Sequence, residues 1–294
     1  MSTARDGSGL GWQDGGSAAG ASLRADDITM AYDQRVVGEH LSVEIPDGGF
    51  TVIIGPNACG KSTLLRALSR LLRPRSGVVH LDGKDIHHQR ARDVATRLGL
   101  LPQSAVAPAG ISVFDLVRRG RYPHQSILSR WSVEDEDGVR RALAATRMED
   151  LASRQVDELS GGQRQRAWVA MALAQESPIL LLDEPTTFLD IAHQISLLDL
   201  FADLNHAGGR TLVAVLHDIN HAARYAEHLV VMSGGRIVAR GAPAEVLTQE
   251  LIADVYGIEA TLIEDPVNGG PLVITKHRGR SATAAPSPRK VAQP

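Results

Sequence analysis

The chain has 294 residues, of which 43% are hydrophobic and 22% are charged, an ordinary balance for a globular protein with a substantial core. A formal net charge of −3 at pH 7 argues against a nucleic-acid-binding protein that relies on overall positive charge. No apolar run approaches the ~20 residues of a membrane span, the N-terminus lacks the apolar core of a signal peptide, and the single cysteine, Cys59, allows no internal disulfide, so a cytoplasmic protein is expected.

The first part of the chain is predicted to be a tail followed by a small antiparallel β layer. Residues 1–21 are rich in Gly, Ser and Ala and indicate a disordered tail. Short β-like stretches follow at 23–32, 36–45 and 78–81. Tyr32 ends the first of these stretches, where a tyrosine taken alone is more often a packing residue than a ligand contact.

A phosphate-loop pattern, G-x-x-x-x-G-K-S-T, follows a buried-strand run at 50–54 and precedes a helical pattern at 64–72. It is formed by Gly55, Pro56, Asn57, Ala58, Cys59, Gly60, Lys61, Ser62 and Thr63. Backbone N–H groups and the dipole at a helix start favour a bound triphosphate. The two outer glycines permit the close turn, Lys61 reaches the terminal phosphates, and the Ser62 hydroxyl can bind Mg²⁺. The pattern therefore predicts a nucleoside triphosphate site.

A short strand and a helical insert are predicted next. The strand, 97–103, ends at Gln103, which by itself is an ordinary solvated loop residue. Residues 105–158 are predicted to form the insert, with helical patterns at 111–119 and 132–147. The loop between these helices is basic and broken by proline, and we interpret it as solvated rather than as facing a partner.

A second glycine-containing helix start lies at residues 160–163. Ser160 is a natural N-cap, and Gly161 and Gly162 leave backbone N–H groups free to meet an anion, with Gln163 next and the helix running to Ala174. There is no lysine here, so the motif offers half of a phosphate site. A plain helix cap is an equally good interpretation of these residues in isolation.

Polar residues follow two buried-strand runs farther along the chain. Asp183 and Glu184 come after 178–182, at the strand end where ligands bind in parallel sheets. Asp183 can hold Mg²⁺ through water, and Glu184 can point at a water that attacks a γ-phosphate; an acidic helix-capping turn is the weaker alternative. His217, after 211–216, can donate a hydrogen bond to a γ-phosphate oxygen, or it is a capping or core histidine.

The C-terminal part is predicted to contain a glycine-turn hairpin at 229–239 and a helix at 243–256. Residues 263–294 form an extension that is basic and largely disordered from about residue 276, where Lys and Arg occur without any acidic residue. Contact of this tail with anionic lipid is a minor alternative.

Taken in order, these motifs resemble the ATP-binding-cassette (ABC) ATPases over residues 22–262. The resemblance is specific because the Ser-Gly-Gly-Gln motif stands just before the Asp-Glu strand. It implies an α/β fold: a RecA-like P-loop core with a small antiparallel β subdomain and an inserted α-helical subdomain. It also implies ATP as the nucleotide, with Mg²⁺.

The resemblance also implies roles for single residues. Tyr32 would stack on adenine, and Gln103 would contact Mg²⁺ and sense the γ-phosphate. Glu184 would be the general base and His217 the γ-phosphate switch. Asp190 would lie in the loop that crosses to a partner subunit.

The missing half of the phosphate site implies a second cassette. Lys61 of one copy and Ser160, Gly161 and Gly162 of another would enclose the same ATP, so that two chains related by a two-fold axis close two sites. A homodimer is therefore expected, although the sequence leaves a heterodimer of two cassettes open.

Further sequence segments are similar to those of bacterial ferric-siderophore uptake ATPases, notably residues 55–60, 98–103, 119–124 and 164–175. That similarity implies a peripheral subunit at the cytoplasmic face of the inner membrane, bound to permease subunits and served indirectly by a substrate-binding protein, with no nucleic-acid partner. Cobalamin and haem importers share much of the sequence of these segments and remain alternatives.

Two residues near these motifs differ from the usual family pattern, and a third is the single cysteine. Ala58 stands where many relatives have Gly, which stiffens the loop slightly, and Phe188 stands where a small residue is commoner, which leaves the crossing contact less certain. Cys59 lies near a helix start, where the pKa of its thiol could be lowered, but a small residue that fits the loop is the better interpretation.

Two other functions remain possible on the sequence. One is a soluble cassette ATPase of translation or repair, against which the chain lacks both a second cassette and a long coiled-coil insert. The other is a nucleotide-dependent switch with little turnover, against which Glu184 and His217 are intact.

Overall fold

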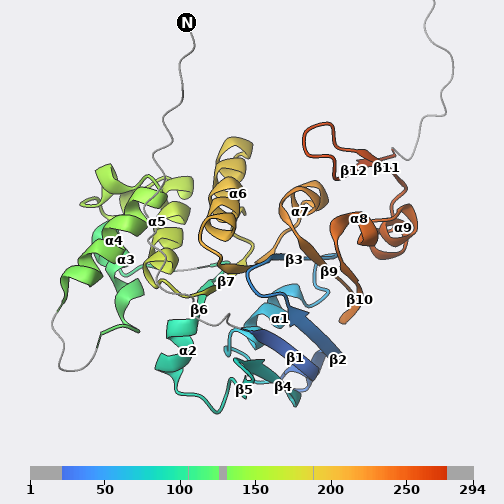
Figure 1. Ribbon diagram of the computed structural model, residues 1–294, viewed down its shortest axis with the longest axis horizontal. Coiled ribbons are helices and arrows are strands. Elements are labelled where there is room, and N and C mark those ends of the chain that lie inside the picture. Colours follow the sequence, from blue (N-terminus) through green and yellow to red (C-terminus); the bar gives the residue numbers. More distant parts are fainter. Residues whose placement is uncertain (1–21, 105, 126–130, 188, 277–294) are drawn as a thin grey trace, which may run out of the picture.

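The computed structural model describes residues 22–104, 106–125, 131–187 and 189–276, and it contains three sheets and the helices around them (Figure 1). The tails predicted at both ends of the chain, 1–21 and 277–294, and the residues Phe188 and 105 lie outside the described residues. Among the described helices, none is long and apolar enough to cross a membrane.

A six-stranded sheet forms the centre, in the order β10-β9-β3-β8-β7-β6. Its strands are β3 (Phe50–Ile54), β6 (Leu98–Leu101), β7 (Ile179–Asp183), β8 (Thr211–Val215), β9 (His228–Ser233) and β10 (Arg236–Gly241). All are parallel except β10, which pairs antiparallel with β9. Strands β3, β7 and β8 are buried along their whole length, as their continuous apolar runs predict. The segments that follow them therefore meet at one edge of the sheet.

A four-stranded antiparallel sheet lies on one side of the centre, in the order β2-β1-β4-β5. It consists of β1 (Leu23–Tyr32), β2 (Arg35–Ile45), β4 (Ser76–Leu81) and β5 (Lys84–Asp85). Helix α1 (Lys61–Leu68) packs between the two sheets within one apolar cluster. The predicted small β layer is thereby confirmed. The helix is shorter than predicted: it begins at Lys61 and ends at Leu68, and Leu71 beyond it is exposed.

The other face of the central sheet carries a second apolar cluster under the helices α5, α6 and α7 (Figure 1). These helices are α5 (Gly161–Ala174), α6 (Ile191–His206) and α7 (Ile219–Tyr225), while α2 (Ala91–Arg97) leads into β6. The helical insert supplies α3 (Val113–Arg118) and α4 (Val133–Ala145), with short 3₁₀ turns at Arg119–Arg121, Glu149–Leu151 and Val156–Glu158. Ser132 and Asp135 make the capping box at the start of α4.

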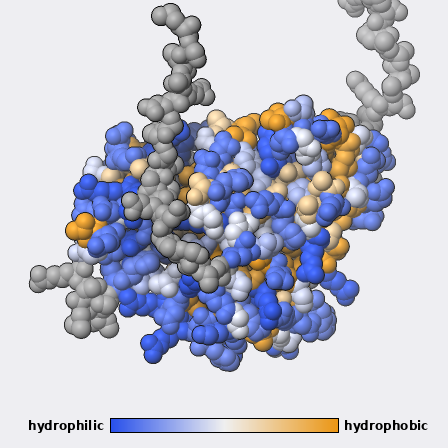
Figure 2. Space-filling view, in the orientation of Figure 1, coloured by the Kyte–Doolittle hydropathy of each residue, from blue (hydrophilic) through white to orange (hydrophobic). Residues whose placement is uncertain are grey.

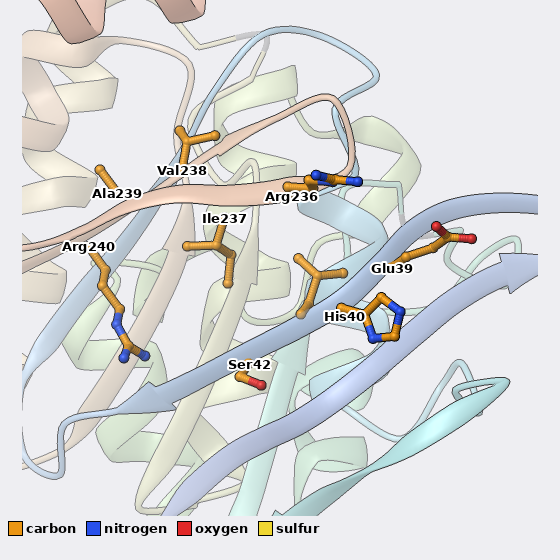
Figure 3. A pocket seen from close by; sticks show the side chains of 9 residues that line it. Glu39, His40, Ser42, Arg236, Ile237, Val238, Ala239 and Arg240 are labelled. Atoms are coloured by element: carbon orange, nitrogen blue, oxygen red, sulfur yellow. The ribbon is translucent and has the colours of Figure 1, made fainter.

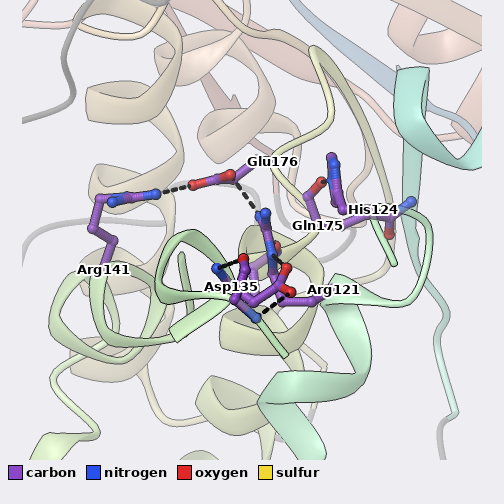
Figure 4. Close-up of polar contacts among 8 residues, drawn as sticks. Arg121, His124, Asp135, Arg141, Gln175 and Glu176 are labelled. Atoms are coloured by element: carbon purple, nitrogen blue, oxygen red, sulfur yellow. Dashed lines mark hydrogen bonds and ion pairs between the residues drawn. The ribbon is translucent and has the colours of Figure 1, made fainter. Parts of the chain in front are cut away.

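The basic loop of the insert differs from its prediction. The Arg121 side chain is not solvated but 6% exposed, and it forms ion pairs with Asp135 and Glu176 (Figure 4). Its NH1 group also donates to the Ala174 carbonyl at 2.9 Å, so the loop is fixed to the end of α5. Apolar periodicity gives no sign of an ion pair between residues 55 positions apart, such as Arg121 and Glu176.

The C-terminal part also departs from its prediction. The single helix expected at 243–256 is divided into α8 (Pro243–Val246) and α9 (Gln249–Tyr256), because the Thr248 side chain accepts a hydrogen bond from the Leu251 N–H and caps a new helix. A hairpin of β11 (Ala260–Glu264) and β12 (Pro271–Thr275) follows, which the sequence analysis did not predict. Figure 2 shows a largely hydrophilic face with apolar side chains gathered toward these C-terminal elements.

Candidate nucleotide-binding site

The phosphate loop makes the turn that its glycines predict. Gly60 caps α1 in the left-handed region with φ 106, and Gly55 has φ 148. A Cβ atom on Gly55 would lie 2.1 Å from the Met232 carbonyl oxygen. Only glycine therefore fits at the point where the loop leaves β3.

Lys61 lies buried at the base of the loop. Its Nζ donates to the carbonyl oxygens of Gly55 at 2.9 Å and Pro56 at 2.8 Å. The ammonium group is thus held inside the loop by backbone oxygens, at the N-terminus of α1, where anionic phosphates are favoured. The loop borders a cleft of about 400 Å³, lined by Val37, Asn57, Ala58, Gly60, Lys61, Ser62, Thr63, Gln103, Glu184 and His217.

Ala58 and Cys59 lie in the tight part of this loop. Ala58 has φ 62, a left-handed conformation in which its Cβ is strained. Cys59 is buried, and burial raises the pKa of its thiol despite the nearby Lys61. The effect of the helix start considered for Cys59 is therefore outweighed, and a small packed residue is the interpretation that holds.

Ser62, which lines the cleft, contacts the buried carboxyl group of Asp183. The Ser62 hydroxyl donates to Asp183 Oδ1 at 2.7 Å, and burial is the main cause that raises the pKa of the Asp183 carboxyl group. A hydroxyl and a carboxylate are oxygen ligands of the kind that Mg²⁺ takes alongside phosphate oxygens. The residues present therefore fit this cation. Gln103, the third predicted ligand, bonds elsewhere.

Glu184 joins three segments that are distant in the sequence. Its Oε2 accepts hydrogen bonds from Gln103 Nε2 at 2.6 Å and from the Thr187 hydroxyl at 3.2 Å. Its Oε1 lies 2.8 Å from His217 Nε2. The backbone of Glu184 is left-handed, with φ 52, a strained state of the kind that concentrates at functional sites. The structure thus brings the predicted glutamine, glutamate and histidine together beside the phosphate loop.

The second glycine motif has the predicted cap. Ser160 accepts a hydrogen bond from the Gln163 N–H at 3.3 Å, and Gln163 Oε1 accepts one from the Ser160 N–H at 3.1 Å. Ser160 and Gly161 are exposed, and a Cβ on Gly161 would meet no described atom within 4 Å. Residues 160–163 do not belong to the described lining of the cleft. The capping box thus uses the N–H groups of Ser160 and Gln163, and the space around Gly161 is open.

Tyr32 and Asp190 lie apart from the cleft lining. Tyr32, the last residue of β1, is 41% exposed, so its ring is accessible to a ligand. Its hydroxyl accepts a hydrogen bond from Arg66 at 3.2 Å. Asp190 caps α6: its carboxylate accepts from the His193 N–H at 2.9 Å and lies 2.8 Å from His193 Nδ1. These contacts with His193 lower the pKa of Asp190.

Val37 and Thr187 contribute to the site and were not found from the sequence. Val37 faces the glycine loop from β2, with its Cγ1 3.4 Å from a Cβ placed on Gly60. Only the pairing of β2 with β1 brings it there. Thr187 had a local signal, because it stands three residues after Glu184 in a turn closed by its N–H and the Glu184 carbonyl.

A larger cavity of about 530 Å³ opens between the edge strands β2 and β10 (Figure 3). It is lined by Glu39, His40, Leu41, Ser42, Arg236, Ile237, Val238, Ala239 and Arg240. It has neither a glycine loop nor a helix N-terminus, and it contains none of the predicted site residues. Size alone therefore does not identify the nucleotide site.

Comparison with known proteins gives consistent matches. Residues 39–187 match the family model described as ABC transporter. The chain is 56% identical to the ferric enterobactin transport ATP-binding protein FepC of Escherichia coli (strain K12) over 264 residues, which cover 90% of this chain and 97% of that protein. It is 44% identical to the iron(3+)-hydroxamate import ATP-binding protein FhuC of Bacillus subtilis (strain 168) over 254 residues, covering 86% and 94%.

A solved structure shares the fold. It is the dimeric post-hydrolysis state of the ATP-binding cassette MJ0796 bound to ADP and Pi, with a TM-score of 0.66 and 26% identity, and the match covers 75% of this chain and 98% of that one. The α/β architecture expected from the motifs is thereby confirmed.

Proposed function

Because the chain belongs to the ABC transporter family of ATPases, we propose that it is the ATP-hydrolysing subunit of a bacterial importer that takes up a ferric siderophore. The observation that carries the proposal is the meeting of Gln103, Glu184 and His217 beside the phosphate loop. The cargo is inferred from the two relatives, which are named for ferric enterobactin and iron(3+)-hydroxamate.

The phosphate loop would hold ATP through its backbone N–H groups and Lys61. In the described conformation Lys61 binds the Gly55 and Pro56 carbonyls, and a bound triphosphate would compete for its ammonium group. Ser62, Gln103 and Asp183 would hold Mg²⁺, which neutralises phosphate charge when bound. Tyr32, with its exposed ring, would stack on the adenine.

Glu184 would orient and deprotonate the attacking water, and His217 would bind the γ-phosphate. In the described conformation the two side chains contact each other and Gln103. Substrate would therefore replace the contacts among these residues, so that the position of Gln103 depends on whether the γ-phosphate is present. The Gln103 segment leads directly into the helical insert, which gives the site a route to a distant surface.

We divide the chain accordingly into a tail (1–21), an ABC ATPase domain (22–262, with the helical insert at 105–158) and a C-terminal extension (263–294). The insert would transmit the state of the site to membrane-spanning permease subunits, with a substrate-binding protein acting indirectly. The subunit would then be peripheral, at the cytoplasmic face of the inner membrane, and would act as a homodimer in which Ser160, Gly161, Gly162, Gln163 and Asp190 reach the partner.

The test replaces the proposed base and keeps its shape. In Glu184→Gln we expect the rate of ATP hydrolysis to fall by about 100-fold or more, because a positioned general base contributes roughly 10²–10⁴-fold. The affinity for ATP should stay within about twofold, since the phosphate loop is untouched. Glu250→Gln, at an exposed position of α9, is the matched control and should hydrolyse ATP normally. Hydrolysis that survives Glu184→Gln would refute the assigned base.

The cargo is tested in cells that carry Glu184→Gln in place of the native chain. Uptake of radiolabelled ferric enterobactin and of a ferric hydroxamate should collapse, while uptake of cobalamin and haem continues. Loss of cobalamin or haem uptake alone would keep the importer and change the cargo. If no uptake changes and the purified chain recovers ribosomes instead of a polytopic membrane protein, the soluble cassette ATPase becomes the better function.

A further inference from the structure

The C-terminal hairpin, β11 with β12, lies against α7, the helix that begins two residues after His217 (Figure 1). Asp218 caps this helix by accepting a hydrogen bond from the His221 N–H at 2.8 Å. The position of His217 therefore depends on where the first turn of α7 lies. With seven residues, α7 is too short to be stable without packing against its surroundings.

Asn220 joins the first turn of α7 to the hairpin. Its Oδ1 accepts a hydrogen bond from the Val273 N–H at 2.8 Å, and its Nδ2 donates to the Val273 carbonyl oxygen at 3.1 Å. The side-chain amide thus pairs with both backbone groups of one residue of β12, as a neighbouring strand would. Asn220 stands three residues after His217, so this contact restrains the segment that carries the histidine.

Arg224 makes a second junction one turn farther along the helix. Its NH2 and Nε groups donate to Asp265 Oδ2 at 2.7 and 3.3 Å. Asp265 is 4% exposed, and its Oδ1 accepts a hydrogen bond from the Val267 N–H at 2.9 Å. The Arg224 hydrogen bond is the first cause that lowers the pKa of this carboxyl group. Since residues four apart share one face of a helix, Asn220 and Arg224 attach the same face of α7 to the hairpin.

An apolar cluster closes the junction. Ile219 of α7 and Leu262 of β11 pack against Ile252, Ala260 and Val273, which are buried. The hairpin is therefore joined to α7 by apolar contact, by a paired amide and by an ion pair.

We propose that Asn220 and Arg224 are positioning residues for His217, and that the C-terminal hairpin braces the γ-phosphate switch. The inference rests on the proposed function, because it gives His217 a role in hydrolysis. The hairpin holds α7 in place, and α7 fixes the segment that carries His217, whose Nε2 lies 2.8 Å from Glu184 Oε1 in this conformation. Displacement of a reacting or orienting group by about 1 Å can lower a catalysed rate about 100-fold.

The test is steady-state ATP hydrolysis by the full chain carrying Asn220→Ala. We expect kcat to fall about fivefold to tenfold, as for substitutions that alter coupling without touching a ligand. KM for ATP should change less than about twofold, because the phosphate loop is intact. Asn268→Ala is the matched control: the Asn268 side chain accepts a hydrogen bond from the Gly270 N–H within the same hairpin and makes no described hydrogen bond to α7, so its loss should leave kcat unchanged. An unchanged kcat in Asn220→Ala would overturn the proposal, and an equal fall of kcat in both variants would overturn the specific role of Asn220.

The second arm asks whether Asn220 acts through His217. In a chain that already carries His217→Ala, adding Asn220→Ala should lower kcat no further, because residues that act as a unit are non-additive. An undiminished additional loss would overturn the positioning role. If His217→Ala alone hydrolyses ATP normally, the proposed role of His217 fails, which is a different result from an inert Asn220→Ala.

Conservative substitutions at Asn220 and Arg224 keep the test informative if the alanine variants misfold. Asn220→Asp keeps the oxygen that accepts from the Val273 N–H and loses the donor. Its kcat should therefore lie between that of the native chain and that of Asn220→Ala. Arg224→Lys keeps one charged donor to Asp265 and should retain more activity than Arg224→Ala. A reversed order in both pairs would contradict the brace.

Discussion

At the scale of single residues, the phosphate loop carries strain that one substitution can release. Ala58 has φ 62, where a residue with a Cβ costs about 1–2 kcal/mol more than glycine, whereas glycine costs about 0.5–1 kcal/mol in chain entropy. We therefore expect Ala58→Gly to raise the free energy of unfolding by about 0.5–1 kcal/mol. Urea denaturation measures this difference. Ala253→Gly, in the helix α9, is the matched control and should lower stability by about 0.5–1 kcal/mol.

The sign of this change separates strain from a functional requirement. If Ala58→Gly lowers stability, the left-handed conformation of Ala58 is not strained and the premise is wrong. If stability rises and the affinity for ATP falls, the alanine restricts the loop to a conformation that binds phosphate. That result would agree with the slight stiffening expected from Ala58 in a loop where many relatives have Gly.

The chemical groups of the site could be predicted from the sequence, but their contacts could not. Lys61 and Ser62 are identified by the phosphate-loop pattern, and Asp183 by its place at the end of a buried strand. Gln103 stands alone in the sequence as an ordinary loop residue, and its hydrogen bond to Glu184 joins residues 81 positions apart. Such a pairing arises only when the parallel sheet brings two strand ends together.

At the scale of elements, strands were predicted well and C-terminal elements poorly. Strands such as β3 and β8 are buried on both faces, so a continuous apolar run identifies them. The hairpin β11–β12 is partly exposed, and its stability depends on α7 and α9, which no local pattern encodes. The break between α8 and α9 follows from the Thr248 cap, a local signal that apolar periodicity concealed.

Buried Arg121 joins the helical insert to the core through its ion pair with the half-buried Glu176, and it pairs with buried Asp135 within the insert (Figure 4). In Arg121→Met, Asp135 and Glu176 lose a partner, and removing one member of a buried pair costs about 3–5 kcal/mol. We expect a loss of this size in the free energy of unfolding from urea denaturation. Arg140→Met is the control: Arg140 is exposed, and its surface ion pair with Glu136 is screened by solvent, so its loss should change stability little. Equal losses in both variants would contradict the buried role of Arg121.

The same ion pair predicts how stability responds to acid. Burial alone would raise the pKa of Asp135 and Glu176, but hydrogen bonds from Arg121, and from Arg141 to Glu176, hold both values below their ordinary range. A lowered pKa stabilises the folded state above the unfolded pKa of about 4 and loses that effect as pH falls through the folded pKa. Stability should therefore fall below pH 4 less steeply in Arg121→Met than in the native chain. An identical acid dependence would show that the Arg121 contacts do not stabilise the ionised carboxylates.

At the scale of the whole molecule, the described chain contains one lysine-bearing phosphate loop and one Ser-Gly-Gly-Gln motif, and that motif does not line the cleft of its own copy. In a two-fold dimer, Lys61 of each copy would share a nucleotide with Ser160 of the other. A chain with Lys61→Ala and a chain with Ser160→Arg should each be inactive alone. Mixed, they form a heterodimer in which one site has both groups intact, so the mixture should recover up to about a quarter of native ATP hydrolysis.

The control for this complementation places both lesions in the same half of the site. Lys61 and Glu184 line one cleft, so mixing Lys61→Ala with Glu184→Gln leaves every site broken and should restore nothing. Recovery in the first mixture and none in the second requires that Ser160 act across the dimer. If neither mixture recovers while native dimers exchange subunits, Ser160 acts within its own chain or only as the cap of α5, and the composite site is wrong. Because ATP would then no longer bridge two copies, hydrolysis could not open and close the dimer, and the coupling to transport would have to run through the helical insert of each copy alone.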